Sequence, residues 1–189
     1  MLTILVFTKI LASFGTEMLA GYGIGSRLEF LLTPITFAFG IASVPMVGMA
    51  IGAGQLKRAR HVAWTAAMAA GLTVGLIGAI VALNPALWVS LFTRDVGVAA
   101  AAHSYFRLAG PAFVFFGVGV SLYFSSQGAA RVGGPVLAST ARLLIVVVGG
   151  VSLTVAQAPA WTLFALVGCS IAVFGLSTAA SVALVRWGK

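Results

Sequence analysis

The uncharged stretch from Phe30 to Leu56, which reads FLLTPITFAFGIASVPMVGMAIGAGQL, decides the fold class of this chain. It contains no Asp, Glu, Lys or Arg, and it exceeds the roughly 20 apolar residues that a helix needs to cross a bilayer. Similar uncharged runs occupy 62–93, 108–130 and 143–185. The last run is too long for one span and divides at Pro159, because proline ends or kinks a helix. The sequence therefore predicts several membrane-spanning helices.

The composition excludes other classes of protein. Of the 189 residues, 61% are hydrophobic and only 7% are charged, whereas soluble domains carry about 25% charged residues. Disordered chains are polar and charged, so disorder is excluded as well. The net charge of +8 does not indicate a nucleic-acid partner, because the basic residues are dispersed rather than clustered on one face. The lipid bilayer is the expected partner.

We predict an all-α fold, a polytopic membrane helix bundle that forms a single domain over 1–189. Its approximately six transmembrane helices are expected at 1–14, 18–51, 61–83, 105–129, 136–156 and 160–186. Pro34 and Pro45 should bend the second helix. The first helix is truncated relative to a full span, so we expect either that Met1 is not the natural start or that the chain is a fragment.

Six helices place both termini on the same side of the membrane. Basic residues are more frequent in the cytoplasm, and the two sides differ in their number of basic residues, so both termini are expected to be cytoplasmic in a plasma (inner) membrane. Lys9 and Arg142 lie near the ends of their predicted helices, where long side chains reach the headgroups. The terminal side holds seven basic residues and the other side three: Lys57, Arg58, Arg60, Arg131, Arg142, Arg186 and Lys189 against Arg27, Arg94 and Arg107.

One face of the second predicted helix is polar. Tyr22, Ser26, Glu29 and Thr33 recur at steps of four, three and four, so they share a helical face. Such a stripe normally faces the bundle interior or a hydrated cavity, because lipid cannot satisfy polar groups. The simpler alternative is that Arg27 and Glu29 only mark the outer interface.

No catalytic signature is found in the sequence, so we predict that the protein is not an enzyme and holds no metal. The single cysteine, Cys169, and the two histidines form no cluster with metal-ligand spacing. Tyr123 and Gln127, one helical turn apart, form a second, weaker polar stripe. The candidate substrate or ion pathway thus comprises Glu29, Tyr22, Ser26, Thr33, Arg27, Tyr123 and Gln127.

Several motifs in this order and spacing resemble the multidrug and toxic compound extrusion (MATE) family. They are LAGYGIGSRLE at 19–29, the proline-bearing helix, Val47-Gly48, Gly52-Ala53-Gly54, LFTRD at 91–95, and YFSSQG at 123–128 followed by Arg131 and Pro135. Family members have twelve helices in two bundles around a central cavity. The chain is similar to the C-terminal six-helix half, which implies a missing N-terminal six-helix bundle as its partner.

The resemblance implies part of a secondary active transporter that exports organic cations, drugs or metabolites in antiport with H⁺ or Na⁺, with no other cofactor. Several members carry an acid in the seventh or tenth helix. Here the first helix offers Lys9 and no acid, and 108–130 has no acid either, so coupling rests on Glu29 or on the missing bundle.

Two alternatives remain open. A flippase for lipid-linked oligosaccharides in the same superfamily would need a strongly cationic cavity, for which Arg27, Lys9 and Arg142 are the candidates. A non-transporting membrane scaffold would have no solvated polar stripe.

Overall fold

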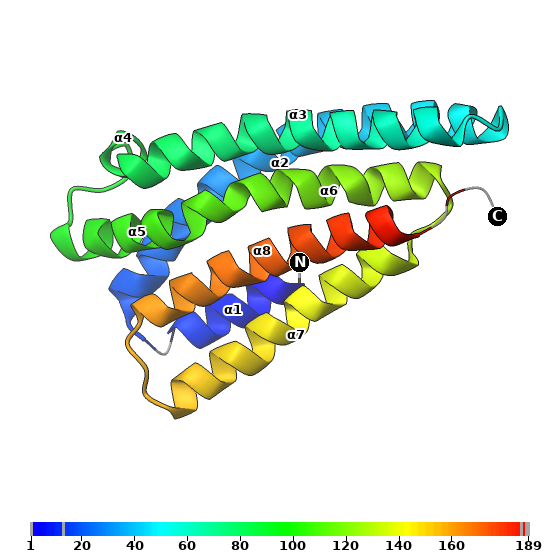
Figure 1. Ribbon diagram of the computed structural model, residues 1–189. Coiled ribbons are helices and arrows are strands. Elements are labelled where there is room, and N and C mark those ends of the chain that lie inside the picture. Colours follow the sequence, from blue (N-terminus) through cyan, green and yellow to red (C-terminus); the bar gives the residue numbers. More distant parts are fainter. Residues whose placement is uncertain (1, 13, 186, 188–189) are drawn as a thin grey trace.

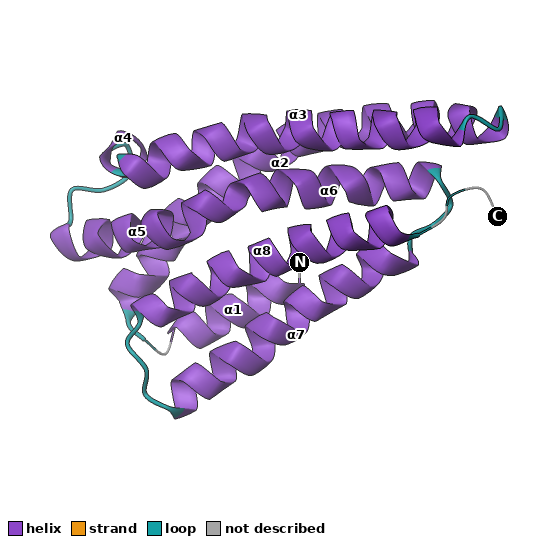
Figure 2. Ribbon diagram, in the orientation of Figure 1, coloured by secondary structure: helices purple, strands orange, loops and turns teal. Residues whose placement is uncertain are grey.

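A computed structural model describes residues 2–12, 14–185 and 187. Every regular element within these residues is helical (Figure 2), which confirms the predicted all-α membrane bundle. The elements are α1 (Leu2–Ala12), α2 (Thr16–Gly52), α3 (Leu56–Leu83), α4 (Ala86–Val89), α5 (Val96–Ala109), the 3₁₀ turn η1 (Gly110–Ala112), α6 (Phe113–Gly128), α7 (Gly133–Val155) and α8 (Trp161–Leu184).

Five segments of the described chain are long and apolar enough to cross a membrane: α2, α3, the continuous run Val96–Gly128 formed by α5, η1 and α6, then α7 and α8. The first helix, α1, has 11 residues and is too short to span on its own. Both Pro34 and Pro45 lie inside α2, which continues through them.

Two predicted helix starts differ from the structure by five residues or more. The third helix begins at Leu56 rather than 61, because Gly54 at φ 73° makes a turn that leaves only three residues between α2 and α3. The fourth begins at Val96 rather than 105. Asp95 starts it by accepting a hydrogen bond from the backbone N–H of Val98 at 2.9 Å, which caps the first turn of α5.

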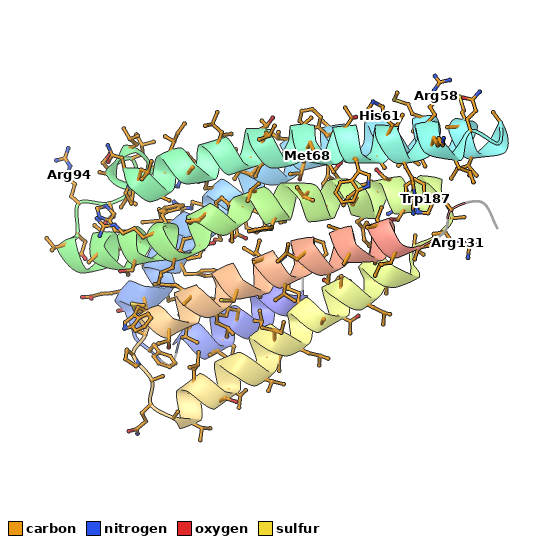
Figure 3. The ribbon with its side chains drawn as sticks, in the orientation of Figure 1. Arg58, His61, Met68, Arg94, Arg131 and Trp187 are labelled. Carbon is orange, nitrogen blue, oxygen red and sulfur yellow. The ribbon has the colours of Figure 1, made fainter. Side chains whose placement is uncertain are left out.

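The helices run roughly along one direction and their connections alternate between two ends (Figure 1). The α2–α3 and α6–α7 connections lie at the same end as the last residues of α8. The segment with α4 and the α7–α8 connection lie at the other end. Arg58 and Arg131 are found at the first end and Arg94 at the second (Figure 3), as the six-helix prediction arranges them.

Glycines at four-residue spacing allow two helix pairs to approach closely. Gly21 and Gly25 of α2 face Ala101 and Tyr105 of α5, and an added Cβ would overlap both neighbours. Gly71 and Gly75 of α3 face Val118 and Val114 of α6 in the same way. Gly48 and Gly52 of α2 have the same four-residue spacing but are less crowded, because a Cβ at Gly48 would lie 3.5 Å from the Gly128 carbonyl oxygen and one at Gly52 would have nothing within 4 Å.

Helix α6 lies between α3 and α8 (Figure 1). At Gly117, a Cβ would come within 2.7 Å of the Ala70 carbonyl oxygen of α3. At Gly175 of α8, it would overlap the Phe115 carbonyl of α6. These three helices therefore touch through their main chains.

Candidate functional site

A hydrogen bond joins α2 to α5 inside the bundle. The hydroxyl of Tyr105 donates to the carboxylate Oε1 of Glu29. Tyr105 is fully buried, and its ring packs edge-on against Tyr22, with centroids 5.7 Å apart, and against Phe164 at 5.5 Å. Gly25 lies one turn before Glu29 and has no side chain, which leaves the space that the Tyr105 ring occupies. Because Gly25 leaves this space, the Tyr105 hydroxyl can lie beside the Glu29 carboxylate that accepts its hydrogen bond.

Glu29 also lines a small internal cavity of about 20 Å³. This volume suits one water molecule, for which about 10–15 Å³ is needed. It is far smaller than the roughly 300–1,000 Å³ of sites for drug-sized ligands. Four helices contribute to the lining, which consists of Phe7, Tyr22, Glu29, Arg142, Val146, Val167 and Ser170. We call Tyr22, Glu29, Tyr105, Arg142 and Ser170 the Glu29 cluster.

Arg142 brings a positive charge to this cavity from α7. Its Nε is buried, and within the described part of the chain it has no hydrogen-bond partner. Its Cζ lies 5.9 Å from the centre of the Phe174 ring. Glu29 lines the same cavity, so its carboxylate is the nearby group whose opposite charge can lower the cost of placing Arg142 inside the bundle.

The prediction that Arg142 extends to the headgroups is wrong. Because α7 begins at Gly133, Arg142 lies about two and a half turns inside the helix and points into the bundle. The terminal side of the predicted topology therefore holds six basic residues rather than seven. Lys9 is exposed, so Arg142 and not Lys9 accompanies Glu29.

The rest of the polar stripe on α2 is satisfied within its own helix. The Ser26 hydroxyl donates to the Gly23 carbonyl at 3.1 Å, and the Thr33 hydroxyl donates to the Glu29 carbonyl at 2.8 Å. Such bonds are common for Ser and Thr in membrane helices. Of the stripe, only Tyr22 and Glu29 reach the cluster.

The remaining candidates lie apart from the cluster. Arg27 is exposed, with its Cζ 5.0 Å from the centre of the Phe92 ring. Tyr123 packs edge-on against Phe124 at 6.2 Å, and Gln127 is exposed in the last turn of α6. Their role in a pathway stays a prediction.

Three members of the Glu29 cluster, Tyr105, Arg142 and Ser170, are absent from the pathway predicted from the sequence. The depth of Arg142 within its helix was a usable signal, because nine residues separate it from the start of α7. Tyr105 offered no such signal, since its partner is fixed by the packing of α5 on α2. Ser170 offered no clear signal either, since its hydroxyl donates to the Val167 carbonyl of its own helix at 2.8 Å.

In the described residues, no three His, Cys, Asp or Glu side chains converge as metal ligands would. The cluster offers instead a carboxylate that can exchange a proton, a phenol that donates to it and a guanidinium of opposite charge on the same cavity.

The model of one protein family, MatE, matches residues 1–152. The chain belongs to the MatE family. No curated protein matches it. The match confirms the resemblance stated from the sequence, and together with the apolar helices it makes this MatE chain an integral membrane protein of a transporter family. Most of the Glu29 cluster lies in the matched part, whereas Ser170 lies beyond it.

Proposed function

We propose that this MatE chain is part of a secondary active transporter that exports organic cations, drugs or related metabolites in exchange for protons. The observation that carries the proposal is the Glu29 cluster, a carboxylate held inside a membrane bundle by Tyr105 and faced by Arg142. Ionisable groups are costly in a membrane, so those that persist there commonly mark ion or substrate pathways.

The composition of the cluster favours H⁺ over Na⁺ as the coupling ion. A sodium ion would share a cavity of about 20 Å³ with the guanidinium of Arg142, which repels it. A proton binds to the carboxylate itself and needs no such space. Glu29 therefore acts in this proposal as the proton-exchanging acid, and the substrate binds elsewhere, because the cavity is too small for an organic cation.

The charges of the cluster also disfavour the flippase alternative. A cavity for pyrophosphate needs an excess of positive charge, yet the cluster carries one guanidinium and one carboxylate. The other candidates for that role, Arg27 and Lys9, are exposed.

We further propose that transport requires a second six-helix bundle. In alternating access, two bundles rock against each other around a site near the midplane, and this bundle supplies one wall. The end that carries Lys57, Arg58, Arg60 and Arg131 faces the cytoplasm of a plasma membrane, in keeping with the positive-inside rule.

Everted membrane vesicles from cells that express the protein from its natural coding region test the proton-exchanging acid. An acid-inside pH gradient should drive ethidium uptake, and a sodium gradient without a pH gradient should not. Glu29→Gln should lower the initial rate at least tenfold at unchanged protein abundance. Asp95→Asn, an acid outside the cluster, should leave it unchanged. Uptake by Glu29→Gln at the parent rate and with the parent pH response would refute the role of Glu29.

A further inference from the structure

An open groove follows the outer surface between α2 and α3, away from the Glu29 cluster. It has a volume of about 540 Å³. Its walls are mostly small or apolar, which leaves a furrow where larger side chains would have filled the space between the helices. The lining residues are Ala38, Phe39, Ala42, Ser43 and Met46 of α2, with His61, Val62, Thr65, Ala66 and Ala69 of α3.

The groove continues toward the start of α3 and becomes basic there. A second hollow of about 310 Å³ shares Met46 and Val62 with the first and is lined by Gln55 and Arg58. In Figure 3, Arg58 and His61 lie near this end of α3 and project away from the bundle. The combined groove is thus apolar along the membrane-spanning part of two helices and carries basic side chains at one end.

Arg58 is the arginine of this turn that lines the groove. Its Nη1 donates to Gln55 Oε1 at 3.2 Å, on the groove side. Arg60 contacts α8 instead of the groove. Its Nη2 donates to the carbonyl oxygens of Ala183 and Val185 at 3.1 and 2.7 Å, next to the C-terminal end of α8.

The positive charge at the basic end of the groove determines which class of ligand can bind there. An organic cation would be repelled by Arg58, whereas a phosphodiester accepts hydrogen bonds from a guanidinium and from an imidazole N–H. The apolar walls suit a hydrocarbon chain, and basic pockets between transmembrane helices recognise anionic lipid headgroups. We propose that the α2–α3 groove binds one anionic phospholipid, with an acyl chain along Ala42 and Ala66 and the phosphate at Arg58 and His61.

Native mass spectrometry of the purified full chain in detergent tests the site with two lipids of equal chain length, palmitoyl-oleoyl phosphatidylglycerol and phosphatidylcholine. The parent should retain phosphatidylglycerol in preference. Arg58→Gln should weaken this binding about fivefold, the effect of roughly one basic residue near an anionic lipid surface. Arg58→Lys should preserve the preference. Arg107→Gln, which removes an exposed arginine away from the groove, should change nothing.

A second pair of variants tests the apolar part of the groove. Ala42→Leu fills the groove and should reduce phosphatidylglycerol binding, whereas Ala79→Leu, an exposed alanine of α3 outside the groove, should not. All these positions are exposed, and circular dichroism should report parent helix content.

Four outcomes would overturn the proposal. The first is equal retention of both lipids by the parent. The second is an effect of Arg107→Gln as large as that of Arg58→Gln. The third is full displacement of the lipid by inorganic phosphate, and the fourth is binding unchanged by Ala42→Leu. Either of the last two would reduce the site to an anion contact.

Discussion

Removing the Tyr105 hydroxyl is the most direct perturbation of the Glu29 cluster. Tyr105→Phe keeps the aromatic ring, so the edge-on contacts with Tyr22 and Phe164 remain and no cavity opens in the core. What disappears is the donor to the Glu29 carboxylate. Glu29→Met removes the carboxylate acceptor and keeps a side chain of similar length. The two substitutions together form a double-mutant cycle that isolates the hydrogen bond.

The expected coupling follows from burial and charge. Hydrogen bonds between membrane helices are worth about 0.6 kcal/mol on average and reach about 1.7 kcal/mol. Hydrogen bonds to charged groups in soluble proteins contribute about 1.5–3 kcal/mol. Tyr105 is 0% exposed and its acceptor is a carboxylate, so the upper end of the membrane range applies. We expect a coupling of about 1.5 kcal/mol, close to a tenfold change in the unfolding equilibrium.

The free energies of unfolding can be measured in mixed micelles by titration with SDS, followed by far-ultraviolet circular dichroism. The parent, both single variants and the double variant complete the cycle. Tyr123→Phe serves as the matched control, because the Tyr123 ring packs on Phe124 outside the cluster, and it should change stability by less than about 0.5 kcal/mol. If the two substitutions add within about 0.3 kcal/mol, the limit for independent sites, the hydrogen bond does not stabilise the bundle and the reasoning fails.

Three further predictions concern packing, capping and topology. Gly25→Ala should destabilise the bundle by about 1–3 kcal/mol through overpacking. Gly23→Ala should be neutral or stabilising, because nothing lies within 4 Å of its Cβ, and thermal melts compare the two variants directly. Asp95→Ala should cost about 1 kcal/mol by uncapping α5, and Asp95→Asn only a fraction of that, which chemical denaturation of the purified variants will measure. A cysteine at Gln55, in a chain otherwise without cysteine, should react with a membrane-impermeant thiol reagent only after the cells are permeabilised; labelling of intact cells would reverse the proposed orientation.

The sequence predicted the helices well because length and apolarity decide membrane spans almost alone. The boundaries at Leu56 and Val96 were less accessible, since they depend on the turn at Gly54 and on the cap at Asp95. Each of these boundaries depends on a single residue, Gly54 or Asp95, within a stretch that the sequence predicts to be a loop.

The Glu29 cluster was predictable in part. Periodicity placed Tyr22 and Glu29 on one face, and both reach the cluster. The same periodicity included Ser26 and Thr33, whose hydroxyls bond within α2, because spacing along a helix does not show which polar groups are satisfied locally. Tyr105 and Arg142 come from two other helices. Only the three-dimensional packing of α5 and α7 around α2 assigns them as partners of Glu29.

The main-chain contacts at Gly117 and Gly175 have a mechanical consequence. No side chains separate α3, α6 and α8 at these contacts, so we expect the three helices to move together. A hydrogen bond between the hydroxyls of Ser43 and Ser125, which lie 2.8 Å apart, joins α2 to α6. Helix α7 packs on α8 and α1 and touches α6 little. Because Arg142 lies on α7 and Glu29 lies on α2, a tilt of α7 relative to α2 would change the distance between the two charges.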